Sequence, residues 1–108
     1  GGVKPFNLAV RDYMNSPEIY QIDVSGYKGN PGEKILVETS DDFVITSVTV
    51  RILDPARKPI EEGLCEFNLL TGNYEFTATI AVPDLAGVVV VAKVCDLPGH
   101  SSESSTTL

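Results

Sequence analysis

Apolar and polar side chains alternate along short stretches of the chain from Glu18 onward, and this period of two is the feature that most constrains the fold. Alternation places apolar side chains on one face of an extended strand and polar side chains on the other. The pattern is strongest over 44–53, where Val48, Val50 and Ile52 share one face. It predicts seven strands, over residues 18–25, 33–40, 44–53, 60–70, 73–81, 87–96 and 100–107.

Short connections separate these strands. One of them, Asn30-Pro31-Gly32-Glu33, fits a type II turn because proline occupies its second position and glycine its third. The connections are too short for repeated helical crossovers, so the strands are expected to be antiparallel. The pattern therefore predicts an all-β fold, a sandwich of two antiparallel sheets with Greek-key connections. We expect a bulge near Gly63, where the 60–70 strand is interrupted.

Residues 1–16 follow a different pattern and precede the predicted sandwich domain, which covers 17–108. Pro5 suits the first position of a helix. The apolar residues that recur with helical spacing after it are Phe6, Ala9, Val10, Tyr13 and Met14. Asn15-Ser16-Pro17 would end such a helix. We predict a short helix here, and the alternative is an ordered arm or a linker from an upstream domain.

The composition excludes several classes of protein. Acidic residues number 15 and basic residues 8, and the net charge of −7 disfavours nucleic acid as a partner because an acidic surface repels phosphate. No apolar run approaches the roughly 20 residues that cross a bilayer, so no transmembrane segment is expected. The apolar share of 43% is too high for a disordered chain, and a length of 108 residues predicts one domain.

Two stretches resemble sequence patterns of bacterial immunoglobulin-like domains. Residues 38–50, ETSDDFVITSVTV, resemble the pattern A-x-D-(N/D)-x-x-V-x-x-V-x-V. Residues 94–101, VCDLPGHS, resemble A-x-D-x-x-G-N-x-S, with His100 where asparagine is usual. The resemblance covers roughly residues 17–107 and implies a seven-stranded immunoglobulin-like sandwich. The sheets expected from it contain 18–25, 33–40 and 73–81, joined by 60–70, and, in the second sheet, 44–53, 87–96 and 100–107.

The same resemblance implies a module of a larger secreted, periplasmic or cell-surface bacterial protein. Such modules serve as spacers, adhesion units or companions of carbohydrate-active domains. The expected function is therefore that of a non-enzymatic spacer or protein-interaction unit. The alternative is a module that binds a glycan or Ca²⁺ at one loop end of the sandwich. Fold alone does not decide between them.

Three carboxylates are expected to meet at that loop end. Asp41 and Asp42 end one predicted strand, Asp96 ends another, and the proposed topology brings both loops to the same end. Ca²⁺ takes six to eight oxygen ligands, so these side chains are a candidate metal site. The alternative is structural, because aspartate side chains also cap turns by accepting hydrogen bonds from nearby backbone amides.

The two cysteines are expected to be free thiols. Cys65 shares its strand face with Phe67 and Leu69, which predicts that it points into the core. Cys95 shares its face with Lys93, which predicts the outer face. A disulfide needs converging Cβ atoms, and these two diverge. A catalytic thiol would need a nearby base. The single histidine is His100, and no third residue that would complete a catalytic triad is evident, so no enzyme is expected.

Several apolar residues of strands 44–53 and 87–96 have the wrong parity for the core. They are Ile45, Leu53, Val89, Val91 and Cys95. On neighbouring strands they would form one apolar patch on an outer face, and such patches usually mark contacts. We expect either the N-terminal helix or another chain to cover it. The helix residues that would do so are Phe6, Val10 and Tyr13. The alternative is that bulges turn some patch residues inward.

Aromatic residues give little support for sugar binding. The chain has no tryptophan, and Tyr27 and Phe43 are the only aromatic residues placed in connections between strands. Phe43 is expected to plug a corner of the sandwich. A glycan therefore remains only an alternative ligand.

Overall fold

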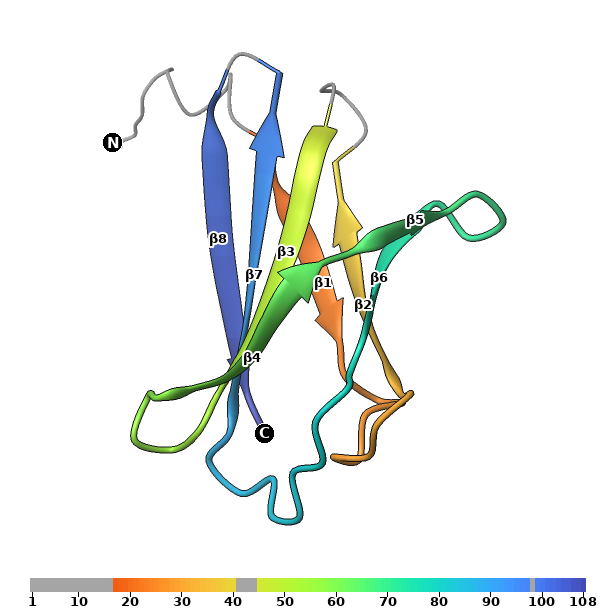
Figure 1. The fold of residues 1–108 in the computed structure, drawn as a ribbon. Helices are drawn as coiled ribbons and strands as arrows, with labels where there is room; N and C mark the ends of the chain where they lie inside the picture. Colours follow the sequence, from red (N-terminus) through yellow and green to blue (C-terminus); the bar gives the residue numbers. More distant parts are fainter. Residues whose placement is uncertain (1–16, 41–44, 98) are drawn as a thin grey trace.

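The computed structural model describes residues 17–40, 45–97 and 99–108, and within these ranges the chain forms strands and no helix. The strands are β1 (Ile19–Asp23), β2 (Lys34–Thr39), β3 (Ile45–Leu53), β4 (Pro59–Leu64), β5 (Glu66–Asn68), β6 (Asn73–Thr77), β7 (Val89–Asp96) and β8 (Ser101–Thr107). Figure 1 shows them running roughly along the long axis of the molecule, except for the oblique β4 and β5. The predicted N-terminal helix lies outside the described residues.

The strands form two antiparallel sheets of four, as in a β-sandwich. One sheet has the order β1-β2-β6-β5 and the other β4-β3-β7-β8. Every pairing within them is antiparallel. The predicted grouping of the strands is confirmed, with β4 as an additional member of the second sheet.

The described residues hold eight strands rather than the predicted seven. The stretch over 60–70 was expected to be one strand, but it divides at Cys65 into β4 and β5, which pair with different sheets. The Cys65 amide still donates to the Val48 carbonyl at 2.7 Å, after which the chain crosses to β6. Gly63 lets the backbone pass close to the Phe76 ring, because a Cβ at this position would lie only 3.0 Å from that ring. The interruption was therefore predicted near the correct residue, but as a bulge rather than a change of sheet.

Both sheets contribute the alternate residues predicted to face inward. Val48, Val50 and Ile52 of β3 pack with Val90, Ala92 and Val94 of β7, and with Ile35, Val37 and Phe76 of the opposite sheet. All of these side chains are buried. Burying a valine or isoleucine side chain fully stabilises the fold by roughly 1.5–3 kcal/mol, so this cluster accounts for much of the stability.

A carboxylate from one sheet also binds the chain of the other. Glu61 of β4 accepts hydrogen bonds from the Thr79 amide at 3.0 Å and the Ile80 amide at 3.1 Å. These contacts lie beyond β6, which ends at Thr77 rather than at the predicted residue 81. None of the described residues belongs to a helix long and apolar enough to cross a membrane.

Candidate functional site

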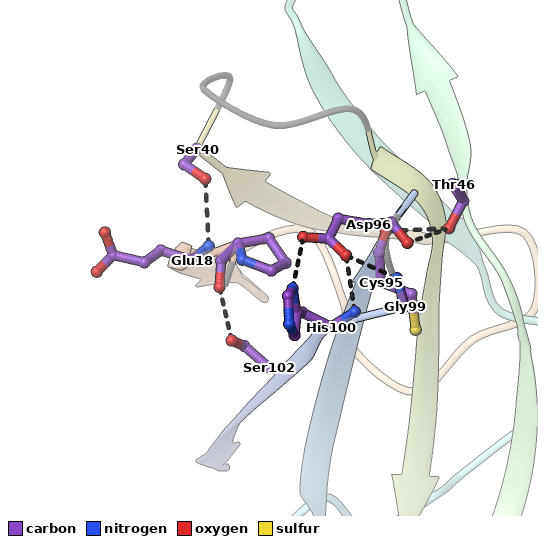
Figure 2. A network of polar contacts seen from close by, with 9 residues as sticks. Glu18, Ser40, Thr46, Cys95, Asp96, Gly99, His100 and Ser102 are labelled. Carbon is purple, nitrogen blue, oxygen red and sulfur yellow. Dashed lines mark hydrogen bonds and ion pairs between the residues drawn. The ribbon is translucent and has the colours of Figure 1, made fainter. Parts of the chain in front are cut away.

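The turn between β7 and β8 is organised around the buried side chain of Asp96 (Figure 2). Its Oδ1 accepts hydrogen bonds from the Gly99 amide at 3.1 Å and the His100 amide at 2.8 Å. Its Oδ2 is buried without a hydrogen bond among the described residues and lies 3.7 Å from His100 Nδ1. Gly99 has a φ of 98°, which favours glycine at this position. Asp96 therefore caps its own turn.

Hydroxyl groups beside this turn fix the start of the sandwich. Ser102 of β8 donates to the Pro17 carbonyl at 2.6 Å. The buried Ser40 accepts from the Glu18 amide at 3.2 Å, and its own amide donates to the Glu18 carbonyl at 2.9 Å. Figure 2 shows these contacts next to Asp96. They tie the segment entering β1 to both sheets at once.

Of the three carboxylates in the predicted calcium site, only Asp96 lies among the described residues. Asp96 lies where it was expected, but its Oδ1 is already engaged by the turn. Asp41 and Asp42 lie outside the described residues. Within the described ranges, no group of three or more metal-binding side chains occurs. The three-carboxylate site stays a prediction, whereas the capping role proposed as its alternative is confirmed for Asp96.

A bulge corrects the predicted position of Ile45. The register of β3 against β7 shifts between Ile45, which pairs with Asp96, and Ser47, which pairs with Cys95. The extra residue, Thr46, donates from its hydroxyl to the Cys95 carbonyl at 3.2 Å. Because one inserted residue reverses the face of the next, Ile45 packs against the core and does not lie in an outer patch.

The other predicted patch residues do not form an exposed apolar surface either. Leu53 and Val89 lie directly opposite each other and are both buried, between Pro59 of β4 and Thr107 of β8. Only two patch residues line a shallow hollow on the outer face, together with polar side chains: Ser47, Thr49, Arg51, Glu62, Val91, Lys93, Cys95 and Glu103. The predicted cover by Phe6, Val10 and Tyr13 lies outside the described residues and stays a prediction.

Both cysteines are free thiols, as predicted. Cys65 packs against the core where the chain passes between the sheets, and burial raises the pKa of its thiol to about 12. Cys95 is half-buried and lines the outer hollow. The two thiols thus occupy the different faces that parity indicated.

The thiol environments predict selective alkylation. We expect iodoacetamide at pH 8 to modify Cys95 at least about ten times faster than Cys65, because the thiolate is the reactive form. With a pKa of about 12, only about one Cys65 thiol in ten thousand is ionised at this pH. Peptide mass spectrometry over time measures both rates in one sample. Equal rates would contradict the packing of Cys65 against the core, and labelling in 6 M urea serves as the control for intrinsic reactivity.

Tyr27 is not available as a sugar-binding surface. Its side chain is only 2% exposed and belongs to the core cluster. Burial raises the pKa of its hydroxyl, and the negative charges of Glu61 and Glu33 add to this effect. The loop between β1 and β2 therefore folds inward at Tyr27, which corrects the expectation of an aromatic residue in an exposed connection. Phe43 lies outside the described residues.

The two most exposed large apolar residues among the described ones lie in the connection between β5 and β6. We call these strands and their connection the apolar hairpin (residues 66–77). Leu69 is 87% exposed, Leu70 96% and Phe67 50%. The Phe67 and Tyr74 rings pack across the strands with centroids 5.0 Å apart. Figure 1 shows the hairpin projecting beyond the body of the sandwich.

Hydrogen bonds hold the tip of the apolar hairpin in place. Asn68 Oδ1 accepts from the Leu70 amide at 2.8 Å, and the Asn68 carbonyl accepts from the Gly72 amide at 2.8 Å. Gly72 has a φ of 76°. The two leucines are thus displayed by a defined turn and do not fold back onto the core.

Parity alone led to the wrong position for this segment. It placed Phe67 and Leu69 in the core with Cys65, but Phe67 is half exposed with its ring against Tyr74, and Leu69 lies in the connection after β5, where strand alternation no longer applies. The available signal was the pair Leu69-Leu70 directly before Thr71-Gly72, because turns are normally polar. Comparisons with protein-family models, curated proteins and solved structures found no match to the chain.

Proposed function

We propose that the chain is a non-enzymatic immunoglobulin-like module of a larger secreted or cell-surface bacterial protein, and that it binds another protein through the apolar hairpin. The strand orders β1-β2-β6-β5 and β4-β3-β7-β8 support the first part, because immunoglobulin-like domains group their strands in this way. The module class rests on this order and on the sequence resemblance, whereas the bacterial surface location rests on the sequence resemblance alone.

The exposure of Leu69 and Leu70 carries the proposal of protein binding. Two nearly fully exposed leucines at an ordered tip lie beside a half-exposed Phe67. Covering each leucine in a partner would contribute roughly 1.5–3 kcal/mol of transfer free energy. Contiguous exposed apolar surface of this kind marks interaction sites in soluble proteins.

The double substitution Leu69→Ser/Leu70→Ser separates binding surface from folding core. We expect its free energy of unfolding to stay within about 0.5 kcal/mol of the wild type, because neither side chain loses buried contacts. Retention on a phenyl resin should fall clearly below that of Leu97→Ser, which changes an exposed leucine in the turn after β7. Urea unfolding and chromatography of the three proteins measure both effects.

Ile52→Ala is the matched control for a residue that the fold requires. Ile52 is fully buried, and its truncation should cost about 2–5 kcal/mol. If the double leucine variant loses more than about 1.5 kcal/mol, the leucines belong to the folding core and the proposed surface is wrong.

A further inference from the structure

The segment from β4 to β6, which includes the apolar hairpin, carries only negative charges. From Pro59 to Thr77 the chain contains four glutamates and neither lysine nor arginine: Glu61, Glu62, Glu66 and Glu75. Within the hairpin, Glu66 lies directly opposite Glu75 across β5 and β6. Like charges in directly opposed positions destabilise a strand pair. The hairpin therefore retains an unfavourable pair that its own fold does not require.

Only one member of this pair is compensated. Glu75 accepts a hydrogen bond from Asn68 Nδ2 at 2.7 Å and lies 4.0 Å from Lys34 Nζ. Glu66 is exposed, and its carboxylate has no hydrogen bond or ion pair among the described residues. A negative charge without a counter-charge thus lies three residues before Leu69, the first of the two exposed leucines.

The acidic and the aromatic side chains of the hairpin lie on opposite faces because side chains alternate along a strand. Glu66 and Glu75 share one face, whereas Phe67 and Tyr74 share the other, where their rings meet. Leu69 and Leu70 form the tip beyond both faces. A surface that fits this shape needs an apolar floor for the tip and positive charge along one side.

We propose that the partner of the apolar hairpin is a protein cleft with an apolar floor and a wall of lysine or arginine. This inference rests on the proposed function and adds the chemistry of the partner. Charge complementarity favours such a cleft, because positive groups facing Glu66 and Glu75 would relieve their repulsion. A second copy would bring the same two glutamates and another −7 of net charge. A lipid surface is disfavoured because anionic headgroups attract basic residues, and the hairpin has none.

Two model peptides probe this chemistry. One is a fluorescent 14-residue amphipathic helix of leucine and lysine, and the other replaces every lysine with glutamate. Anisotropy in 150 mM NaCl measures their dissociation constants for the full chain. We expect the lysine peptide to bind and the glutamate peptide to bind at least 10-fold more weakly. Leu69→Ser/Leu70→Ser should weaken the lysine peptide at least 10-fold, whereas Leu97→Ser should not.

A pair of charge variants controls for net charge. Glu66→Gln and Glu18→Gln each remove one negative charge. Glu18 is exposed and directly precedes β1, the strand at the other edge of the sheet that contains β5. We expect Glu66→Gln to weaken the lysine peptide at least 3-fold and Glu18→Gln less than 1.5-fold. Equal effects of the two variants would show non-specific attraction and overturn the inference.

The remaining outcomes separate this inference from the function on which it rests. If both peptides bind equally and both lose affinity in the leucine double variant, the basic wall is wrong but the docking hairpin stands. If neither peptide depends on the leucines, both proposals fail. Leucine-dependent binding to phosphatidylcholine vesicles would show that the hairpin binds lipid. A leucine-dependent dimer in sedimentation velocity would show that it binds a second copy of the chain. Either result would overturn the proposal of a protein cleft.

Discussion

Replacing Gly29 with alanine is expected to cost about 4 kcal/mol of unfolding free energy. Gly29 is buried at φ 94°, and a Cβ there would overlap the carbonyl oxygen of Val82. The backbone conformation alone costs an L-residue roughly 1–2 kcal/mol. Moving Val82 away would also lengthen the 2.7 Å bond from its amide to the Gly29 carbonyl, worth about 1 kcal/mol, and overpacking adds roughly 1–3 kcal/mol.

Gly32 provides the control within the same loop. It has a similar φ of 89°, but a Cβ there would have no atom within 4 Å. Gly32→Ala should therefore cost only the conformational strain, about 1 kcal/mol. Urea unfolding of the two variants measures the difference, which we expect to be about 3 kcal/mol. Equal losses would show that the contact between the first loop and Val82 does not hold the sandwich together.

Asp96→Ala is the second substitution with a large expected effect, about 3 kcal/mol. It removes an acceptor that binds two backbone amides from a buried position. Hydrogen bonds to a charged group contribute roughly 1.5–3 kcal/mol each, and solvent access to the freed amides reduces the total loss. Circular dichroism at increasing urea concentration gives the free energy of unfolding.

Asp96→Asn distinguishes the turn cap from the charge. An asparagine oxygen can still accept from the Gly99 and His100 amides, so this variant should lose only about 1–1.5 kcal/mol. The same small loss in Asp96→Ala would mean that the side chain does not cap the turn. A loss in Asp96→Asn as large as that in Asp96→Ala would point to a role that depends on the carboxylate charge.

The sheets were predictable because each strand carries its own alternation and its own turn residues. Val50 and Val90 point inward as their parity requires, and the strands group into the expected sheets. A two-residue period is a local property, so it survives without knowledge of the partner strand. It also placed Cys65 against the core and Cys95 on the outer face correctly.

The prediction errors arise where contacts with distant parts of the chain change the face on which a residue lies. The bulge at Thr46 turns Ile45 inward, and its hydrogen bond to β7 cannot be seen in one strand alone. The chain changes sheets at Cys65, so Phe67 lies on the edge strand β5 and stays half exposed. Tyr27 is buried because its loop folds under the sandwich, whereas its sequence neighbours are typical of an exposed turn.

The central claim is that another protein contacts the apolar hairpin. The most direct measurement places a photoreactive phenylalanine derivative at Leu70 or at Leu97 of the complete protein, in the cells that produce it, followed by irradiation and mass spectrometry. Both positions are exposed and lie on different connections, after β5 and after β7. The account predicts one discrete cross-linked product from Leu70 and none from Leu97. No product from Leu70, or the same products from both positions, would contradict it.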